Sequence, residues 1–102
     1  MTTGSANKLY DSESEFQRDA IKYIESRNGY IVKVTVSSYN KKGTPDLIIC
    51  FKGRFVAIEL KVKDNKPSKI QETKMKQIVR AGGIAKPAWT IQEIKEILDE
   101  IS

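Results

Sequence analysis

Two carboxylates and one amine are the side chains of this sequence whose types and spacing could do chemistry. Asp46 precedes an apolar run, Glu59 lies thirteen residues later, and Lys61 follows two residues beyond it. Carboxylate oxygens together with water suit Mg²⁺ or Mn²⁺, which prefer hard oxygen ligands. If the two acids face each other, their repulsion favours a divalent cation between them, and the ammonium offsets part of the same charge. The trio therefore predicts a site for a divalent metal ion.

The sequence contains no histidine. This absence excludes Ser-His-Asp and Cys-His nucleophilic sites, His-ligated zinc sites and nucleases that depend on histidine. Any catalysis must therefore come from carboxylates, lysine, tyrosine or a metal ion.

A tight hairpin is the element that must bring the two acids together. Residues 47–51 form an unbroken apolar run, and residues 54–62 are rich in β-branched and apolar side chains, so both stretches predict strands. Lys52-Gly53 is the turn signal between them, because glycine tolerates the positive φ of a hairpin turn.

The length of that turn sets which residues face each other. A two-residue turn places Phe51 opposite Arg54, and the same register places Asp46 opposite Glu59 with Cβ atoms roughly 4.5–5.5 Å apart. Lys61 then shares the face of Glu59, because side chains alternate along a strand. A three-residue turn would shift the register by one and send the two acids to opposite faces.

The rest of the sequence predicts three helices and two further strands around the hairpin. Capping-box patterns start at Ser12, Ser68 and Thr90, and apolar residues repeat at helical spacing after each. The expected helices cover residues 13–28, 69–81 and 91–101, and the expected strands cover residues 30–36, 47–51, 54–62 and 84–88. The order α-β-β-β-α-β-α predicts an α/β fold with a mixed sheet flanked by helices, its fourth strand parallel to its third.

Length and charge limit the class of protein. A chain of 102 residues indicates one domain, here residues 13–102 after a flexible tail of residues 1–12. The net charge of +5 and the pI of about 9.4 favour polyanionic partners. The sequence has no membrane-spanning run and no signal-peptide core, and its single cysteine, Cys50, lies in an apolar run where we expect it to be buried. These features agree with a cytoplasmic protein.

Several short motifs resemble the VRR-NUC family of the PD-(D/E)XK nuclease superfamily over roughly residues 13–90. Its central signature is similar to Gly43-Thr44-Pro45-Asp46-Leu47, Ile58-Glu59-Leu60-Lys61 and Ser68-Lys69-Ile70-Gln71. Its N-terminal acidic motif is similar to Glu15-Phe16-Gln17, and the small turn after its crossover helix to Ala81-Gly82-Gly83. The resemblance implies a restriction-endonuclease-like core.

The resemblance also implies a metal site. Asp46 and Glu59 would ligate Mg²⁺ or Mn²⁺ together with the backbone carbonyl of Leu60. Glu15 would complete or orient this set of ligands from the first helix. Glu15 is also the third helical residue of a capping box, where glutamate simply satisfies the helix start, so both roles stay open.

Lys61 and Gln71 complete the implied catalytic set. Lys61 would position or activate the attacking water and stabilise charge in the transition state, and Gln71 would contact the water, Lys61 or the scissile phosphate. Phosphodiester hydrolysis needs a hydroxide-like nucleophile and neutralisation of a pentacovalent phosphate, which a metal ion and a lysine supply together. Gln71 also occupies a capping-box position, so a purely structural role stays open for it too.

Basic and aromatic residues on both sides of the candidate site are expected to contact DNA. One group belongs to a run of six lysines within residues 61–76, and the other lies in the polar loop before the hairpin. Lysines track phosphates, and a tyrosine stacks on an unpaired base. A solvated lysine face and a tyrosine that only anchors its loop are the alternatives. The residues are Tyr39, Lys41, Lys42, Lys63, Lys66 and Lys69.

The sequence therefore predicts a metal-dependent DNA endonuclease. Minimal members of related families look like structure-selective nucleases that act as homodimers, so the resemblance implies branched DNA, such as four-way (Holliday) junctions, as the substrate. A two-fold dimer would present two cuts to such a symmetric substrate. The apolar stripe of residues 91–101 is either a dimer face or a stripe packed on its own sheet. Alternatives are a flap, nicking or single-strand nuclease, an RNA nuclease, and a DNA-binding module without catalysis. Standalone proteins that resemble this one are common in phages and prophages, so the resemblance suggests a phage or prophage origin in a bacterial host.

Overall fold

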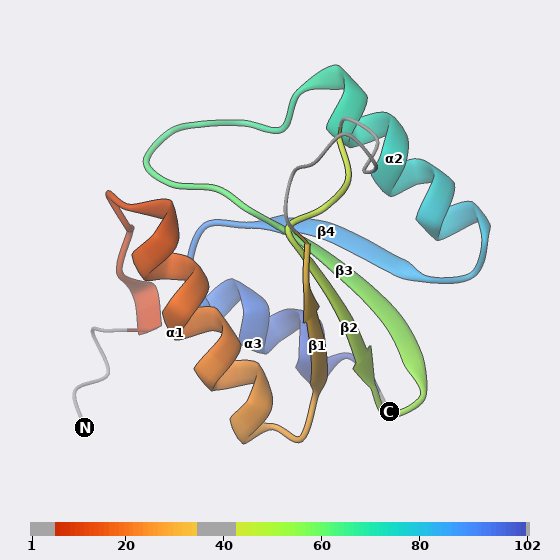
Figure 1. Cartoon of the computed structure of the whole chain (residues 1–102), viewed down its shortest axis with the longest axis horizontal. Helices are drawn as coiled ribbons and strands as arrows, with labels where there is room; N and C mark the ends of the chain where they lie inside the picture. The colour runs from red at the N-terminus through yellow and green to blue at the C-terminus, as the bar shows by residue number, and fades with distance from the viewer. Residues whose placement is uncertain (1–5, 35–42, 102) are drawn as a thin grey trace.

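The secondary-structure elements follow the expected order along the chain. The computed structural model describes residues 6–34 and 43–101, and Figure 1 shows their arrangement. The helices are α1 (Glu13–Ser26), α2 (Lys69–Arg80) and α3 (Ile91–Asp99), and the strands are β1 (Tyr30–Lys33), β2 (Leu47–Phe51), β3 (Arg54–Leu60) and β4 (Ile84–Ala88). The predicted order α-β-β-β-α-β-α is confirmed.

The four strands form one mixed sheet in the order β1-β2-β3-β4. β2 is antiparallel to β1 and β3, and β4 is parallel to β3, as the crossover helix predicted. Phe51 lies opposite Arg54. Both turn residues between them have positive φ, 51° at Lys52 and 77° at Gly53, the backbone that a two-residue hairpin turn requires. The predicted register of the hairpin is confirmed.

Each helix begins at the capping residue that the sequence indicated. The side chains of Ser12, Ser68 and Thr90 all accept a hydrogen bond from the third helical N–H. Helix α1 ends earlier than expected because Asn28 takes a left-handed φ of 67° and the Gly29 N–H turns back to the carbonyl of Ile24. Among the described residues, no helix is long and apolar enough to cross a membrane.

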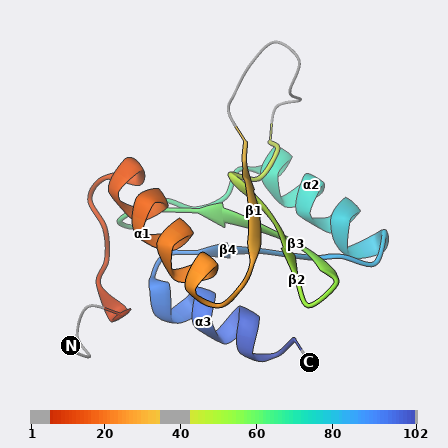
Figure 2. The ribbon, with the colours of Figure 1, turned by 60° about the horizontal axis from the view of Figure 1, so that its bottom comes forward.

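Helices α1 and α3 cover one face of the sheet, and α2 lies on the other (Figure 2). The core between α1, α3 and the sheet contains fully buried Phe16, Ile24 and Leu98, which pack with Leu47 and Ile58 of the strands. The apolar stripe of α3 is therefore used in its own core, which favours the second of the two interpretations of residues 91–101.

The other face of the sheet, which we call the outer face, is covered only in part. Leu47 and Phe51 of β2 point into the core, so the alternation of the strand places Cys50 on the outer face, where it is exposed. The prediction of a buried cysteine was wrong, because a run of five apolar residues does not reveal that only one face of the strand is covered. Tyr30, Val32 and Phe55 are also exposed.

The segment before α1 differs from the expected flexible tail. Tyr10 is buried, its ring stacks on Phe16 at 4.6 Å between centroids, and its hydroxyl donates to Asp19 at 2.8 Å. Tyr10 therefore belongs to the core, which the polar composition of residues 6–12 did not indicate.

Strand β1 leads directly to the end of β2 that carries the predicted metal ligands. The backbone N–H of Val34 donates to the carbonyl oxygen of Asp46 at 3.0 Å. The expected strand 30–36 is described only as far as Val34, and the predicted DNA contacts Tyr39, Lys41 and Lys42 lie outside the described residues.

Candidate active site

The hairpin brings Asp46, Glu59 and Lys61 together at one end of the sheet. Asp46 directly precedes β2, Glu59 lies near the end of β3, and Lys61 follows that strand. The Leu60 N–H donates to Asp46 Oδ2 at 2.8 Å, and Lys61 Nζ lies 3.5 Å from Glu59 Oε2. The two acids and the lysine therefore meet across the hairpin, as the register predicted.

Glu59 is buried, with only 3% of its surface exposed. Its Oε2 accepts a hydrogen bond from Gln71 Nε2 at 2.6 Å and lies near the ammonium of Lys61. Its Oε1 is also buried but has no hydrogen-bond partner among the described residues. An unpartnered buried carboxylate oxygen is costly, so this atom is the point in the site that calls for a ligand.

Both acids of the site hold protons more tightly than exposed carboxyls do. Burial, together with the neighbouring charge of Asp46, raises the pKa of Glu59 to about 7, although Lys61 opposes part of the rise. Burial also raises the pKa of Asp46, against the lowering effects of the Leu60 N–H and Lys61. Because neither acid ionises freely beside the other, a cation between them would stabilise both charges.

The donor set therefore fits a divalent cation. Two carboxylates converge, and one of their oxygens is buried without a hydrogen-bond partner among the residues that the structure describes. A pair of hard oxygen ligands suits Mg²⁺ or Mn²⁺. Among residues 6–34 and 43–101, no three His, Cys, Asp or Glu side chains lie close enough together to hold a metal ion. Asp46 and Glu59 are thus the pair of acidic side chains at this site, and the carbonyl of Leu60 stays a prediction.

Glu15 is not brought into this pair. Its carboxylate lies 3.3 Å from Lys8 Nζ and 3.9 Å from Arg18, and its backbone N–H donates to the Ser12 cap. The structure records no return bond from the Glu15 side chain to Ser12, unlike the complete capping boxes of the other two helices. These ion pairs give Glu15 a structural role, and its predicted contribution to the metal shell has no support in the geometry.

Gln71 combines the two roles that its sequence position left open. Its Oε1 accepts from the Ser68 N–H at 2.9 Å and completes the capping box of α2, while its Nε2 donates to Glu59. The start of α2 is thereby fixed to the acid of β3. The partner that the sequence predicted for Gln71 was the water, Lys61 or the phosphate, whereas the observed partner is Glu59.

Exchange of Gln71 for glutamate should separate these two roles. Glu at this position keeps the capping bond to Ser68, but it replaces the donor to Glu59 with a like charge. We expect Gln71→Glu to keep α2 folded, as backbone chemical shifts would report, and to lower the cleavage rate about tenfold or more. Gln71→Ala should lose both activity and about 1 kcal/mol of stability. Full activity in the glutamate variant would show that the bond to Glu59 is unimportant.

The predicted DNA contacts Lys63, Lys66 and Lys69 lie beside this site, in and after the segment that joins β3 to α2. All three are exposed, and none forms an ion pair with a described residue. Free ammonium groups next to a carboxylate pair are suited to phosphates on either side of a scissile bond.

Two residues near the site were missed as participants by the sequence interpretation. The indole Nε1 of Trp89 donates to the carbonyl of Asn65 at 2.8 Å, and the carbonyl of Tyr10 accepts from the Lys63 N–H at 3.2 Å. Neither contact leaves a sequence pattern, because both join backbone groups of the basic segment to residues far away in the chain.

Comparisons with known proteins agree with this site and fold. The sequence model described as archaeal Holliday junction resolvase (Hjc) matches residues 8–92. A solved VRR_NUC domain superposes with a TM-score of 0.73 at 18% identity, covering 88% of this chain and 97% of that domain. No curated protein matches the sequence.

At 18% identity the VRR_NUC likeness shows the fold, and it confirms the predicted restriction-endonuclease-like core. The family match spans most of the chain and includes Asp46, Glu59 and Lys61. The chain therefore belongs to the archaeal Holliday junction resolvase family, a PD-(D/E)XK-like family of nucleases, which are hydrolases that act on DNA.

Proposed function

We propose that this protein is a metal-dependent endonuclease that hydrolyses phosphodiester bonds in branched DNA, such as four-way junctions, as a homodimer. The observation that carries the proposal is the pairing of Asp46 with a buried Glu59, next to the ammonium of Lys61. Glu59 Oε1 has no hydrogen-bond partner within residues 6–34 and 43–101. The net charge of +5 agrees with a DNA substrate.

Asp46 and Glu59, with the Leu60 carbonyl, would hold Mg²⁺ or Mn²⁺. When bound, the metal ion supplies a hydroxide-like nucleophile and neutralises phosphate charge. Lys61 presents an ammonium beside the same carboxylates, where it donates to the attacking water or to a phosphate oxygen as negative charge develops. Gln71 holds the carboxylate of Glu59 in place.

The substrate proposal rests on the family and on symmetry. The matching family is described by its action on Holliday junctions, and a four-way junction needs two cuts related by a two-fold axis. A single copy of this domain carries one such site, so a C2 dimer would supply the pair. We further propose that the protein is encoded by a phage or prophage and acts on DNA in the cytoplasm of a bacterial host.

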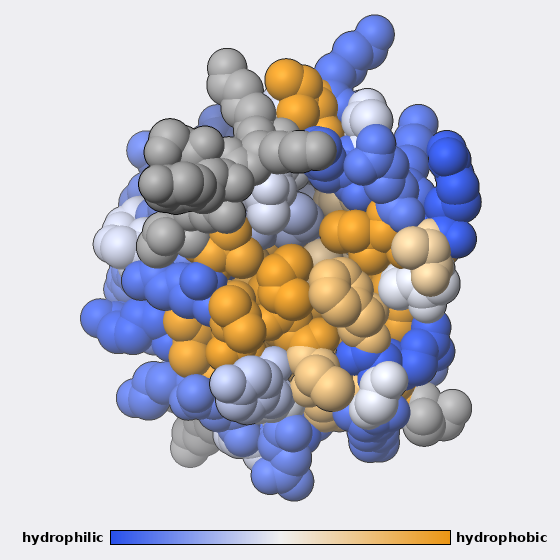
Figure 3. Space-filling model, turned by 45° about the vertical axis from the view of Figure 1, so that its right-hand side comes forward, coloured by the Kyte–Doolittle hydropathy of each residue, from blue (hydrophilic) through white to orange (hydrophobic). Residues whose placement is uncertain are grey.

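The outer face is the surface that favours dimerisation. Tyr30, Val32 and Phe55 are 72%, 51% and 48% exposed, and Figure 3 shows apolar side chains gathered on this side of the molecule. Together with the partly exposed Ile48, they lie on neighbouring strands of the same face, and exposed apolar patches of this kind mark interaction surfaces. The stripe of α3 is already buried, so the outer face is the better candidate for contact with a second copy.

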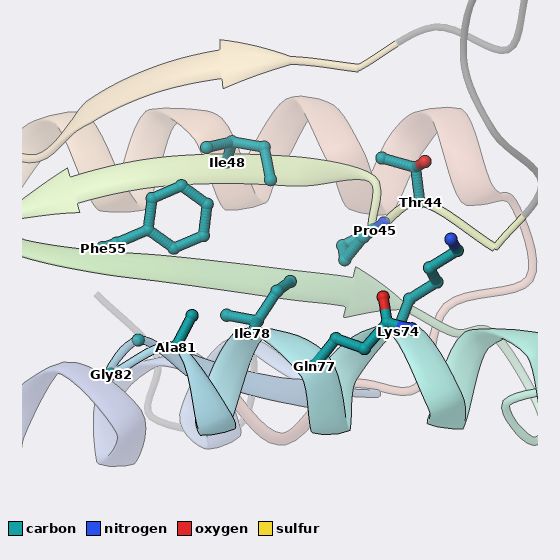
Figure 4. Close-up of a pocket in the computed structure, with 10 residues that line it drawn as sticks. Thr44, Pro45, Ile48, Phe55, Lys74, Gln77, Ile78, Ala81 and Gly82 are labelled. Atoms are coloured by element: carbon teal, nitrogen blue, oxygen red, sulfur yellow. The ribbon is translucent and has the colours of Figure 1, made fainter.

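A cavity lies on the outer face, and Ile48 and Phe55 are among the residues that line it. It encloses about 620 Å³ between the sheet and α2. Figure 4 shows Phe55 and Ile48 facing it from the strands and Ile78 from the helix, with Lys74 and Thr44 at one end. Apolar walls of this kind suit insertion of an apolar side chain from a partner copy. The cavity lies on the same face of the sheet as Glu59, so dimer contacts there would stand next to the catalytic groups.

A charge placed on the outer face should break the dimer. We expect the wild-type protein to have twice the 11.5 kDa mass of one chain in light scattering, and Phe55→Lys to run as a monomer that nicks junctions singly. Leu9→Lys is the matched control, because Leu9 is 61% exposed and lies in the segment before α1. A dimeric Phe55→Lys protein would exclude this face.

Cleavage assays test the central proposal. Labelled four-way junction, flap, single strand and linear duplex are compared with Mg²⁺, with Mn²⁺ and with chelator. Paired, symmetric cuts in the junction support the proposal, and cuts confined to flaps or single strands favour the alternative nuclease classes. Binding without any metal-dependent cutting would indicate a non-catalytic DNA-binding module.

A further inference from the structure

The segment that joins β3 to α2, residues 61–68, is a short loop that carries exposed lysines beside the candidate active site. The Asn65 N–H closes a turn onto the carbonyl of Val62 at 3.1 Å, and Lys63 within this turn has a left-handed φ of 55°. A non-glycine residue in this region of backbone space is uncommon, so surrounding contacts must hold the turn in place.

Three contacts from two separate parts of the chain, the segment before α1 and the end of β4, hold the turn in place. The Lys61 N–H donates to the carbonyl of Ala88 at 2.9 Å, and the Lys63 N–H donates to the carbonyl of Tyr10 at 3.2 Å. The third is the bond from the Trp89 indole to the carbonyl of Asn65. It is the one contact of the three that is made by a side chain, so it is the one that a substitution can remove.

Trp89 is itself firmly placed. It follows β4, whose last residue Ala88 is fully buried, and its backbone N–H donates to the carboxylate of Glu93 in the first turn of α3. The indole thus connects the loop to the end of a strand and the start of a helix. Because Trp89 is held at the end of β4 and the start of α3, its indole N–H can fix the loop while its own side chain stays in place.

We propose that Trp89 is a positioning residue for DNA binding, whose indole N–H holds the loop in the turn that presents Lys63 and Lys66 to phosphates. The inference rests on the proposed action on DNA. A loop held in its binding conformation avoids the entropic cost of ordering its lysines when DNA binds. Trp89 acts through the loop, and it needs no contact with DNA.

Trp89→Phe removes the N–H donor and keeps an aromatic ring. We expect about fivefold weaker binding to a four-way junction in metal-free buffer, the size of one lost hydrogen bond. In cleavage assays KM should rise with little change in kcat. The slope of log Kd against log salt should become shallower, because lysines that leave their positions release fewer counterions.

Two sets of variants distinguish loss of loop positioning from a general loss of protein stability. Arg27→Ala breaks a 2.8 Å ion pair between Arg27 and Asp99, away from the loop, so it should lower the melting temperature and leave Kd and its salt slope unchanged. A Lys63→Ala, Lys66→Ala double variant should bind weakly. Trp89→Phe added to that double variant should then have little further effect, because the lysines that it positions are gone.

The outcomes distinguish this inference from the proposed function. Wild-type affinity in Trp89→Phe, an unchanged salt slope, or full additivity with the lysine changes would overturn the positioning role. Wild-type affinity in the lysine double variant would instead overturn the assignment of this loop to DNA. A Trp89→Phe protein that weakens binding with a shallower slope, and does so only when the lysines are present, supports the inference.

Discussion

Glu59→Gln should abolish metal-dependent DNA cleavage, with a loss of about a thousandfold or more. The amide keeps the size of the side chain but removes the charge that faces Asp46. It also places a donor or a neutral acceptor at Oε1, which has no partner in the described part of the chain. A metal ion held by one remaining carboxylate would bind weakly. Single-turnover cleavage of a labelled junction at saturating enzyme measures the effect.

The control for this change is Glu100→Gln, the same exchange at an exposed glutamate that caps the end of α3. We expect it to cut DNA as the wild type does. Glu15→Gln tests in addition whether α1 contributes to the metal shell, and its ion pairs with Lys8 and Arg18 predict a small effect. A Glu59→Gln protein that cleaves at the wild-type rate would remove the basis of the proposed mechanism.

The metal-free protein should lose stability as the pH rises from about 5 to about 7. Burial raises the pKa of Glu59 to about 7 from an ordinary 4.5, so in this range the folded protein holds a proton that the unfolded chain has released. The free energy of unfolding therefore falls with rising pH, by up to about 3 kcal/mol, and levels off above the folded pKa.

Urea unfolding at pH 5, 6, 7 and 8 in chelator measures this slope, and Glu59→Gln should flatten it. Addition of Mg²⁺ should stabilise the wild type more at pH 8 than at pH 5, because the cation competes with the proton for the same carboxylates. An equal slope in the wild type and in Glu59→Gln would mean that the buried acid does not control the pH dependence.

The pairing of Asp46 with Glu59 could be predicted from the sequence because one short turn determines it. Lys52-Gly53 permits a two-residue hairpin, and this turn fixes the register that brings Asp46 and Glu59 together. The capping boxes likewise fixed where α2 and α3 begin, because a cap depends on residues only three positions apart. Local rules of this kind are readable from one sequence.

The burial of individual side chains and their contacts with distant residues could not be predicted from the sequence. Cys50 and Leu47 lie in the same apolar run, yet one is exposed and the other buried, because α2 leaves part of the outer face open. Trp89 gave no signal of its contact with Asn65, since 24 residues separate them. Tyr10 belongs to a polar segment and still packs on Phe16. Tertiary packing decides all three cases.

The bond between the Val34 N–H and the Asp46 carbonyl has a consequence for how such a nuclease changes its selectivity. The described backbone leaves the sheet after Val34 and re-enters it at Leu47, directly after Asp46, so a different peptide between Val34 and Gly43 would start and finish close to a predicted metal ligand. The three helices and the paired residues of the four strands all lie outside residues 35–42. Segments exchanged at this junction should therefore alter which DNA is chosen while the hydrolytic groups stay the same.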